Sequence, residues 1–330
     1  MRDVTRLAKA HLHVHLESTV RWQTLHEIGA ANGVEVPSHL SDGSTVFSGF
    51  RQFADANAVI RGCLLRPEDF TRIALEFCED EAAQGTRYAE VTFTAAAHGE
   101  RLGDLGMPLA AVLSGLEEGQ RRYGIVCRVI LDHSRRRSVE RAWSTLKLAT
   151  AHEEVIGIGM AGEETYPLAP FAEVVDAAKE AGLRLLHHAG ECCGADSIRE
   201  AIHIGHSERL GHGVRVLDDP ELVAEVRDRR VPLEVCPSSN VILGVAESLA
   251  AHPLPKLREA GLIVTVNTDI PNMMGISLSD EYARVRDAFG YDDTVLAEFA
   301  RAGVDASFAP DALKARMHRE ITEWLAQPTR

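Results

Sequence analysis

Short apolar runs alternate with stretches of helical periodicity along most of this chain. Eight of the runs have the length and apolar content of buried strands. They lie at about residues 8–16, 87–93, 125–131, 155–159, 183–189, 207–212, 231–236 and 262–268. Between them, apolar positions recur at three- and four-residue intervals, as on one face of a helix. These helical stretches include 68–84, 108–123, 138–151, 170–181, 194–204 and 219–229.

Strands that are apolar throughout are typical of a parallel sheet covered by helices. Eight consecutive strand–helix units favour a closed barrel over an open sheet. We therefore predict the α/β class, with a TIM-type (β/α)8 barrel formed by a single domain, residues 1–330. An insertion after the first strand and extra helices at the C-terminus complete the predicted architecture.

The predicted insertion, residues 17–66, carries three phenylalanines at three-residue intervals, namely Phe47, Phe50 and Phe53. One interpretation is that they pack in the core beneath a helix. The other is that they form an apolar lid over the mouth of the barrel, where the C-terminal ends of the strands meet. The second interpretation makes Phe50 and Phe53 candidate substrate-binding residues.

Polar side chains with metal-binding and acid–base chemistry stand at the predicted C-terminal ends of four strands. They are His13 and His15 on strand one, His188 and Glu191 on strand five, His212 on strand six, and Asp269 on strand eight. Catalytic groups of such barrels sit at this end of the strands. We therefore expect all six side chains to converge on one mouth.

Three neutral imidazoles and one carboxylate make a suitable ligand set for a single zinc ion. His13 and His15 alternate along a strand, so they point to the same face and can hold one metal together. Of the adjacent pair His187 and His188, we assign the ligand to His188, because Gly190 and Glu191 follow it at the strand end. His187 should then face the surrounding helices.

Glu191 and His212 supply the acid and the base that hydrolysis at a metal requires. A carboxyl group in a dry pocket keeps its proton more easily, so Glu191 can act as an acid. The alternative for Glu191 is a structural charge at the start of a helix. His212 stands between Gly211 and Gly213, which allow close backbone approach, and is placed to hold and deprotonate a water molecule. Asp269 offers a further ligand to the metal or a hydrogen bond to that water.

Composition limits the classes of partner and compartment. The net charge of −14 argues against a nucleic acid or an anionic membrane as the main partner. The short basic run Arg135–Arg137 is interpreted as solvated surface. No window reaches the roughly 18 apolar residues of a membrane span, and the N-terminal residues lack an apolar signal core. Six cysteines without a Cys-x-x-Cys pair are interpreted as free thiols, and together these features predict a cytoplasmic protein. The sequence does not indicate an oligomeric state.

Three motifs occur in a specific order: His-Ala-Gly-Glu at 188–191, Leu-Gly-His-Gly at 210–213 and Cys-Pro-Ser-Ser-Asn at 236–240. With them the chain resembles the adenosine deaminase family of the amidohydrolase superfamily, and the similarity runs almost from end to end. The resemblance implies a zinc-bearing barrel that removes an exocyclic amine from an aromatic heterocycle and releases ammonia.

The resemblance also implies roles for individual residues of this chain. The metal ligands of the family fall on His13, His15, His188 and Asp269. Its ring-nitrogen proton donor falls on Glu191, its water-activating histidine on His212, and a backbone position near a purine ring nitrogen on Gly162.

The residues that read the substrate depart from the family pattern. A second aspartate, which contacts the imidazole nitrogen of a purine, is replaced by Ile270. Adenosine deaminases usually read Leu-Asp-Gly after the first strand, with the aspartate near the sugar 5′-hydroxyl, whereas Glu17 stands here and Ser18 follows it. We therefore expect a small-molecule amino-heterocycle other than plain adenosine. Candidates are a 5′-substituted adenine nucleoside such as aminodeoxyfutalosine, or a heterocycle that makes no contact through a purine N7.

Two other readings stay open. Another mononuclear-metal amidohydrolase, which cleaves an amide or an ester, shares the His-x-His motif and the strand-eight aspartate but usually lacks a donor such as Glu191. Such enzymes often have a second metal bridged by a lysine on strand four, and residues 157–160 contain no lysine. The non-enzymatic reading is a binding protein that has kept the fold.

Overall fold

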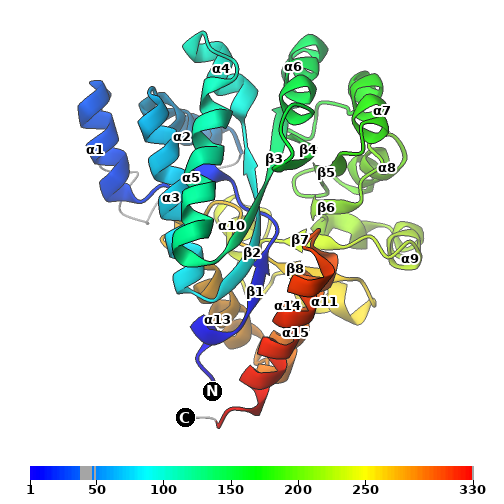
Figure 1. The fold of residues 1–330 in the computed structure, drawn as a ribbon. Coiled ribbons are helices and arrows are strands. Elements are labelled where there is room, and N and C mark those ends of the chain that lie inside the picture. Colours follow the sequence, from blue (N-terminus) through cyan, green and yellow to red (C-terminus); the bar gives the residue numbers. More distant parts are fainter. Residues whose placement is uncertain (38–46, 48–49, 329–330) are drawn as a thin grey trace.

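Eight parallel strands form one sheet, in which each strand pairs with the next along the chain (Figure 1). The structure is a computed structural model that describes all residues except 38–46, 48–49 and 329–330, together with the side chain of Phe50. The strands are β1 (Lys9–His11), β2 (Thr86–Phe93), β3 (Val126–Ser134), β4 (Val155–Ala161), β5 (Arg184–Ala189), β6 (Arg209–His212), β7 (Leu233–Val235) and β8 (Val264–Val266). The predicted TIM barrel is confirmed, and every predicted strand is present.

The barrel closes between the segments that follow β8 and β1. Asp269 N–H donates to His13 O at 3.0 Å, and His15 N–H donates to Asp269 O at 3.0 Å. A further bridge joins His15 to Thr92 of β2. Residues 12–15 therefore continue along the barrel wall although the regular strand ends at His11. The closing seam thus lies at the same place as two of the predicted metal ligands.

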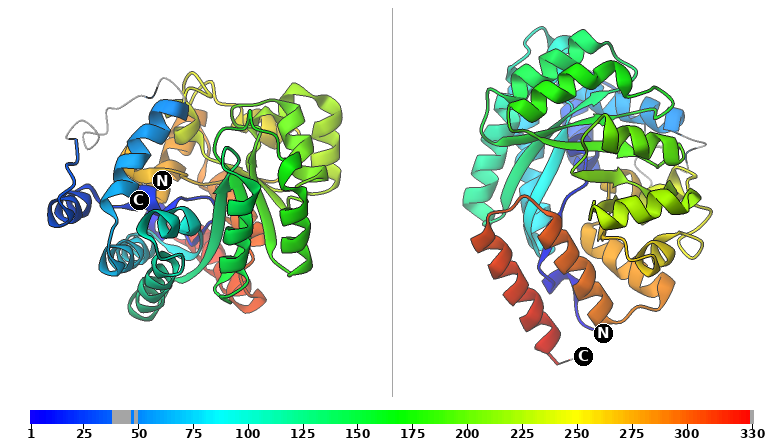
Figure 2. Two further views of the ribbon diagram at one scale, coloured as in Figure 1. Left: turned by 90° about the horizontal axis from the view of Figure 1, so that it is seen from above. Right: turned by 90° about the vertical axis from the view of Figure 1, so that its right-hand side faces the viewer.

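Helices surround the strands on the outside of the barrel, as the view from above shows (Figure 2). They include α3 (Pro67–Ala83), α5 (Met107–Tyr123), α6 (Val139–Ala149), α7 (Ala172–Glu180), α8 (Ala195–His203), α9 (Pro220–Asp228) and α11 (Leu254–Glu259). Each has one apolar face. In α3, Phe70, Ile73, Ala74 and Phe77 are buried at helical spacing, which is why this segment forms a helix that packs inward. The predicted helical stretches are confirmed to within a few residues at each end.

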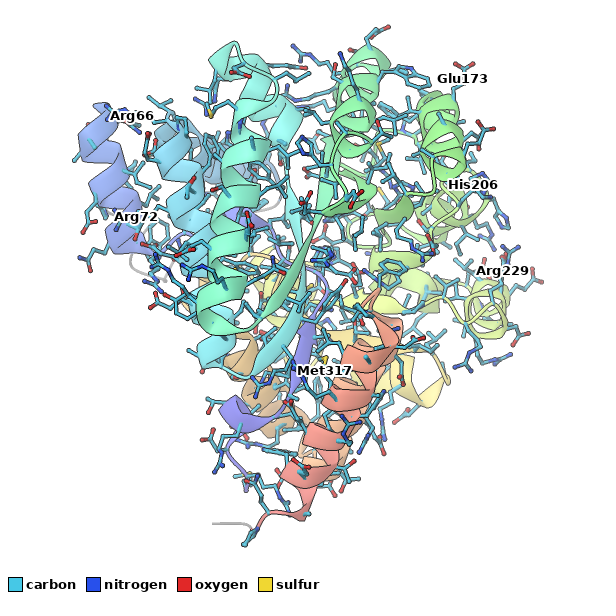
Figure 3. All side chains as sticks on the ribbon, viewed as in Figure 1. Arg66, Arg72, Glu173, His206, Arg229 and Met317 are labelled. Atoms are coloured by element: carbon cyan, nitrogen blue, oxygen red, sulfur yellow. The ribbon has the colours of Figure 1, made fainter. Side chains whose placement is uncertain are left out.

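The additional helices lie in the predicted insertion, in the loops at the mouth and at the C-terminus. They are α1 (Trp22–Asn32), α2 (Phe50–Cys63), α4 (Ala95–Leu102), α10 (Pro237–Ile242), α12 (Pro271–Met274), α13 (Leu278–Phe289), α14 (Asp293–Ala306) and α15 (Asp311–Ala326). Short 3-10 helices are η1 (Val4–Arg6), η2 (Leu16–Thr19), η4 (Ala169–Phe171) and η5 (Val214–Asp218). Met317 of α15 is buried, whereas Glu173 and Arg229 are exposed on the outer helices (Figure 3). Trp324 Nε1–H donates to Asp3 O at 2.8 Å and ties α15 to the N-terminal segment.

The barrel interior contains buried charges as well as apolar side chains. Arg209 of β6 is 1% exposed; its Nε–H donates to Glu234 Oε1 at 2.6 Å, and its guanidinium also pairs with Glu90. Phe308, on the chain after α14, stacks on this guanidinium with its ring centre 4.4 Å away. A buried charge needs such partners, because burial without them costs several kcal/mol.

The structure also bears on the cysteines and on membrane-spanning helices. All six cysteines are free thiols, as expected. Within the described part of the chain, none of the helices combines the length and the apolar character that crossing a bilayer requires.

Candidate active site

The four predicted metal ligands converge at the mouth of the barrel. His15 Nε2 lies 3.2 Å from His188 Nε2 and 3.3 Å from Asp269 Oδ1, and His13 Nε2 lies 3.6 Å from the same oxygen. One ligand atom from each of the four residues lies within 4.8 Å of the others. These residues come from three separate regions of the chain, and the fold brings them together around one point at the ends of the strands.

The chemistry of this cluster fits a divalent metal. Glu234 Oε2 accepts a hydrogen bond from His13 Nδ1 at 2.8 Å. The proton of His13 therefore lies on Nδ1, and the lone pair of Nε2 faces the cluster. His13 Nε2 is buried and has no hydrogen-bond partner. Three imidazole nitrogens and a carboxylate are a donor set that suits zinc.

Unusual backbone conformations aim two of the side chains. His212 has φ +64° and Asp269 has φ +63°, in the left-handed region that residues other than glycine seldom adopt. Such conformations cost of order 1–3 kcal/mol and are found mainly at functional sites. Gly211 makes room for the cluster, because a Cβ atom there would lie 2.9 Å from Cε1 of His13.

Glu191 lies beside the cluster, in the loop between β5 and α8. Its Oε1 is 3.6 Å from His212 Nε2 and has no hydrogen-bond partner. Burial, with the negative charges of Asp269 and Glu164, raises the pKa of Glu191 well above its ordinary value. The sequence-based assignment of Glu191 as a proton donor needs a shift in this direction.

The loop that carries Glu191 is held by a carboxylate that the sequence analysis did not identify. Glu164, in the loop after β4, accepts hydrogen bonds from the backbone N–H groups of Gly190, Glu191 and Cys192 at 2.7, 2.8 and 2.9 Å. Its Oε2 also accepts from Ser197 Oγ at 2.6 Å. An acidic pair directly after a buried apolar strand, Glu163-Glu164, was the available signal.

A chain of hydrogen bonds sets the tautomer of His212. Leu254 N–H donates to His252 Nδ1 at 3.0 Å, and burial lowers the pKa of His252 to about 4, so its proton lies on Nε2. His252 Nε2 then donates to Asn240 Oδ1 at 3.1 Å, and Asn240 Nδ2 donates to His212 Nδ1 at 3.3 Å. Burial lowers the pKa of His212 to about 3. Neutral His212 therefore presents an Nε2–H donor to the site, which differs from its predicted role as the base that deprotonates a water molecule.

The cluster forms the floor of a cavity of about 970 Å³, part of it open to solvent. Its wall includes His15, His188, Glu191, His212 and Asp269. Of the predicted substrate-binding residues, Glu17, Gly162 and Phe53 line this cavity. Ile270 is fully buried in the apolar core and is not among the lining residues. The side chain of Phe50 lies outside the described part of the chain.

The local contacts of Glu17 and Gly162 define two sides of the cavity. Glu17 Oε1 accepts from Thr94 N–H at 3.2 Å and lies 3.1 Å from His98 Nε2. Burial would raise the pKa of Glu17, but the hydrogen bond and charge of His98 outweigh it and lower the pKa to about 2. Gly162 has φ +86°, and a Cβ atom there would lie 2.8 Å from Ser134 Oγ, so this position requires glycine.

Helix α2 lies against this cavity through Phe53, whose ring packs edge-on against Phe47 at 5.8 Å between centres. Phe47 N–H donates to Ile242 O of α10 at 3.2 Å and connects this segment to the loop after β7. Phe53 belongs to the apolar core and also lines the cavity. Phe53 therefore combines features of both interpretations of the insertion, since it packs in the core and also faces the cavity at the barrel mouth.

The basic run after β3 differs from its interpretation as solvated surface. Arg135 is 3% exposed and donates from Nη2 to His188 O at 2.5 Å. Arg136 and Arg137 line the cavity, together with Arg61 of α2. The strand extends to Ser134, three residues beyond its predicted end, and so delivers the run directly to the barrel mouth.

Known proteins share this fold and this arrangement of the chain. The model of the adenosine deaminase family matches residues 8–324. An adenine deaminase of Agrobacterium fabrum is 33% identical, over 95% of this chain and 97% of its own. An aminodeoxyfutalosine deaminase of Streptomyces coelicolor is 34% identical, over 98% of this chain and 86% of its own.

Solved structures agree with these relatives. An adenine deaminase from Arthrobacter aurescens has a TM-score of 0.92 at 32% identity, over 97% of this chain and 100% of that one. An amidohydrolase from Burkholderia ambifaria with bound zinc has a TM-score of 0.89 at 26% identity, over 98% of this chain and 93% of that one.

Proposed function

The chain belongs to the adenosine deaminase family and is a hydrolase of C–N bonds, and from this we propose that it is a zinc-dependent deaminase of an adenine derivative or a related heterocycle. The reaction exchanges an exocyclic amine for an oxygen and releases ammonia. The observation that carries the proposal is the cluster of His13, His15, His188 and Asp269 on the cavity floor, with Glu191 beside it.

His13, His15, His188 and Asp269 would hold the metal. A zinc ion held there lowers the pKa of a water molecule and so supplies a nucleophile at neutral pH. The family relative with bound zinc supports the choice of this metal. Glu234 has a positioning role, because its hydrogen bond to His13 Nδ1 keeps the Nε2 lone pair directed at the cluster.

The side chains of the site perform the proton transfers. Glu191 donates its proton to a ring nitrogen, which makes the amine-bearing carbon electrophilic. The water oxygen adds to that carbon and its proton passes to the Asp269 carboxylate, while His212 orients the oxygen through its Nε2–H donor. The C–N bond then breaks as the amine takes the proton from Asp269 and leaves as ammonia. The hydroxyl proton passes to the Glu191 carboxylate, and the ring carbon keeps the oxygen as a carbonyl.

Differences at the cavity favour a substrate other than plain adenosine. The aspartate that pairs with a purine imidazole nitrogen is replaced by Ile270, which lies in the apolar core and does not line the cavity, so this position offers no partner to that nitrogen. Glu17 replaces the aspartate usual near a sugar 5′-hydroxyl. The two relatives named above act on different compounds by their names, so family membership alone does not select the substrate.

Ammonia release from the zinc-loaded protein tests the proposal. The panel holds adenosine, adenine, 5′-modified adenosines, pterins, cytosines and triazines. Turnover of one compound should disappear in Glu191→Gln and persist in Glu173→Gln, a matched change at an exposed position of α7 (Figure 3). Efficient turnover of adenosine itself would refute the substrate proposal, and turnover that survives Glu191→Gln would refute the mechanism.

A further inference from the structure

Three arginines line the outer part of the catalytic cavity. Arg61 comes from α2, and Arg136 and Arg137 come from the loop that follows β3. An adjoining surface hollow shares Arg61 and Arg137 and adds Arg101 of α4 and Arg141 of α6. We call Arg61, Arg136 and Arg137 the mouth arginines. They meet although α2 and the loop are far apart in the sequence.

Few carboxylates pair directly with the arginines of this region. Glu100 lines the adjoining hollow and forms ion pairs with two arginines. Its Oε2 lies 3.5 Å from Arg137 Nη1 and 3.2 Å from Arg141 Nε. Neither Arg61 nor Arg136 has a carboxylate oxygen within 4.0 Å among the described residues. Arg61 Nε is buried and lacks any hydrogen-bond partner there.

Within the described part of the chain, the carboxylates that line the cavity form no ion pair with the mouth arginines, although the charge of Arg61 acts on Glu17 and Asp132 at longer range. Glu17 is engaged by His98 at 3.1 Å, and Glu163 lies 3.7 Å from Arg51. The two catalytic carboxylates face the metal cluster. The chain as a whole carries −14, so an uncompensated group of cations at the cavity is a local exception.

These cations also repel one another. Burial, followed by the charges of Arg141, Arg61 and Arg136 against the single opposing carboxylate Glu100, lowers the pKa of Arg137. An anion among the guanidinium groups would relieve this repulsion and supply the missing hydrogen-bond acceptor. Planar guanidinium groups bind phosphate and carboxylate groups with paired hydrogen bonds.

We propose that the substrate carries an anionic group, a phosphate or a carboxylate, at its end remote from the reacting amine, and that the mouth arginines bind it. This inference rests on the proposed function, because the metal cluster at the floor decides where the amine lies. His15, His188 and Asp269 of the metal cluster line the same cavity as the mouth arginines. A substrate whose amine lies at the cluster can therefore carry a charged extension toward the arginines within one cavity.

A matched substrate series tests the anionic group. The compounds are adenosine, adenosine 5′-carboxamide, adenosine 5′-carboxylate and adenosine 5′-monophosphate, which share one heterocycle. An anionic compound should exceed the neutral ones in kcat/KM by roughly 10- to 100-fold, the range for hydrogen bonds to charged groups. The phosphate and carboxylate arms show which source is preferred. Equal kcat/KM for neutral and anionic compounds would overturn the proposal.

Variants assign the effect to the arginines. Arg136→Gln, at an exposed position, and the double variant Arg136→Gln/Arg137→Gln should raise KM for the anionic compound and leave kcat and the neutral compounds nearly unchanged. Arg229→Gln removes the same charge at an exposed site on the chain after α9 and should change nothing (Figure 3). An anionic preference that survives in the double variant would show that the arginines do not bind the anion.

Binding measured without turnover separates this proposal from the proposed function. Calorimetry on the Glu191→Gln protein compares Kd for adenosine 5′-monophosphate and adenosine 5′-carboxylate with Kd for adenosine, before and after both arginines are replaced. Tighter, arginine-dependent anion binding by Glu191→Gln, together with no ammonia release from any compound by the zinc-loaded wild-type protein, would support the anion site and refute the deaminase. Ammonia release by the wild-type protein, with no preference for anionic compounds in either assay, would support the deaminase and refute the anion site.

Discussion

Replacing Glu234 by Gln should weaken metal binding more than its effect on folding explains. Glu234 Oε2 accepts from His13 Nδ1 at 2.8 Å, and its Oε1 accepts from Arg209 Nε at 2.6 Å. A glutamine has one oxygen and one NH2 group, so it cannot accept from both. If its oxygen faces Arg209, its NH2 donates to His13 Nδ1, and the imidazole proton moves to Nε2, where it blocks the lone pair.

The expected magnitude follows from these contacts. Loss of a hydrogen-bond partner behind a metal-ligating histidine lowers metal affinity by about 10- to 100-fold, or roughly 1.4–2.7 kcal/mol. Removing one charge from the buried pairs of Arg209 also destabilises the fold by about 3 kcal/mol or more. The second effect has a matched control, because Glu90 pairs with the same guanidinium and is fully buried, yet it does not contact His13.

The assay compares Glu234→Gln with Glu90→Gln. Both variants should lose similar stability in urea unfolding of the metal-free protein. Zinc affinity, measured by competition with a chromophoric chelator, should fall in Glu234→Gln and stay near the wild-type value in Glu90→Gln. Equal zinc affinity in the two variants would refute the role assigned to Glu234, whether both fall or neither does.

Three further outcomes are expected. Burial raises the pKa of Glu281 from its ordinary 4.5 to about 7, so between these pH values the native state holds a proton that the unfolded state has released. Proton binding stabilises the native state fully below about pH 4.5, and this contribution is lost as the pH rises through 7. Glu281→Gln should therefore remove a fall of order 3 kcal/mol from the urea-unfolding free energy between pH 5 and 8, unlike exposed Glu173→Gln. His252→Phe should lower kcat by about 10- to 100-fold at unchanged zinc content, because Asn240 loses its orienting donor; an unchanged kcat would contradict the hydrogen-bond chain. Removing zinc with a chelator should abolish ammonia release and lower Tm, since a ligand bound only to the native state stabilises it, and added zinc should restore both.

Several features of this protein are determined by local sequence. The eight strands and the helices between them follow from apolar periodicity, because a buried strand and a one-sided helix each require their own spacing of apolar residues. The convergence of the four predicted metal ligands was also predictable. His13, His15, His188 and Asp269 stand at strand ends, and a parallel barrel brings all such ends to one mouth.

Tertiary structure alone decided the features that depend on partners from distant segments. The tautomer of His212 is set through Asn240 and His252 on the chain after β7, and the loop of Glu191 is held by Glu164 from the loop after β4. The basic run after β3 looked like solvated surface until β3 was seen to extend to Ser134 and α2 to bring Arg61 beside it. Periodicity reports which face of an element is buried, whereas a pKa, a tautomer or a charge imbalance depends on the atoms that the fold places opposite.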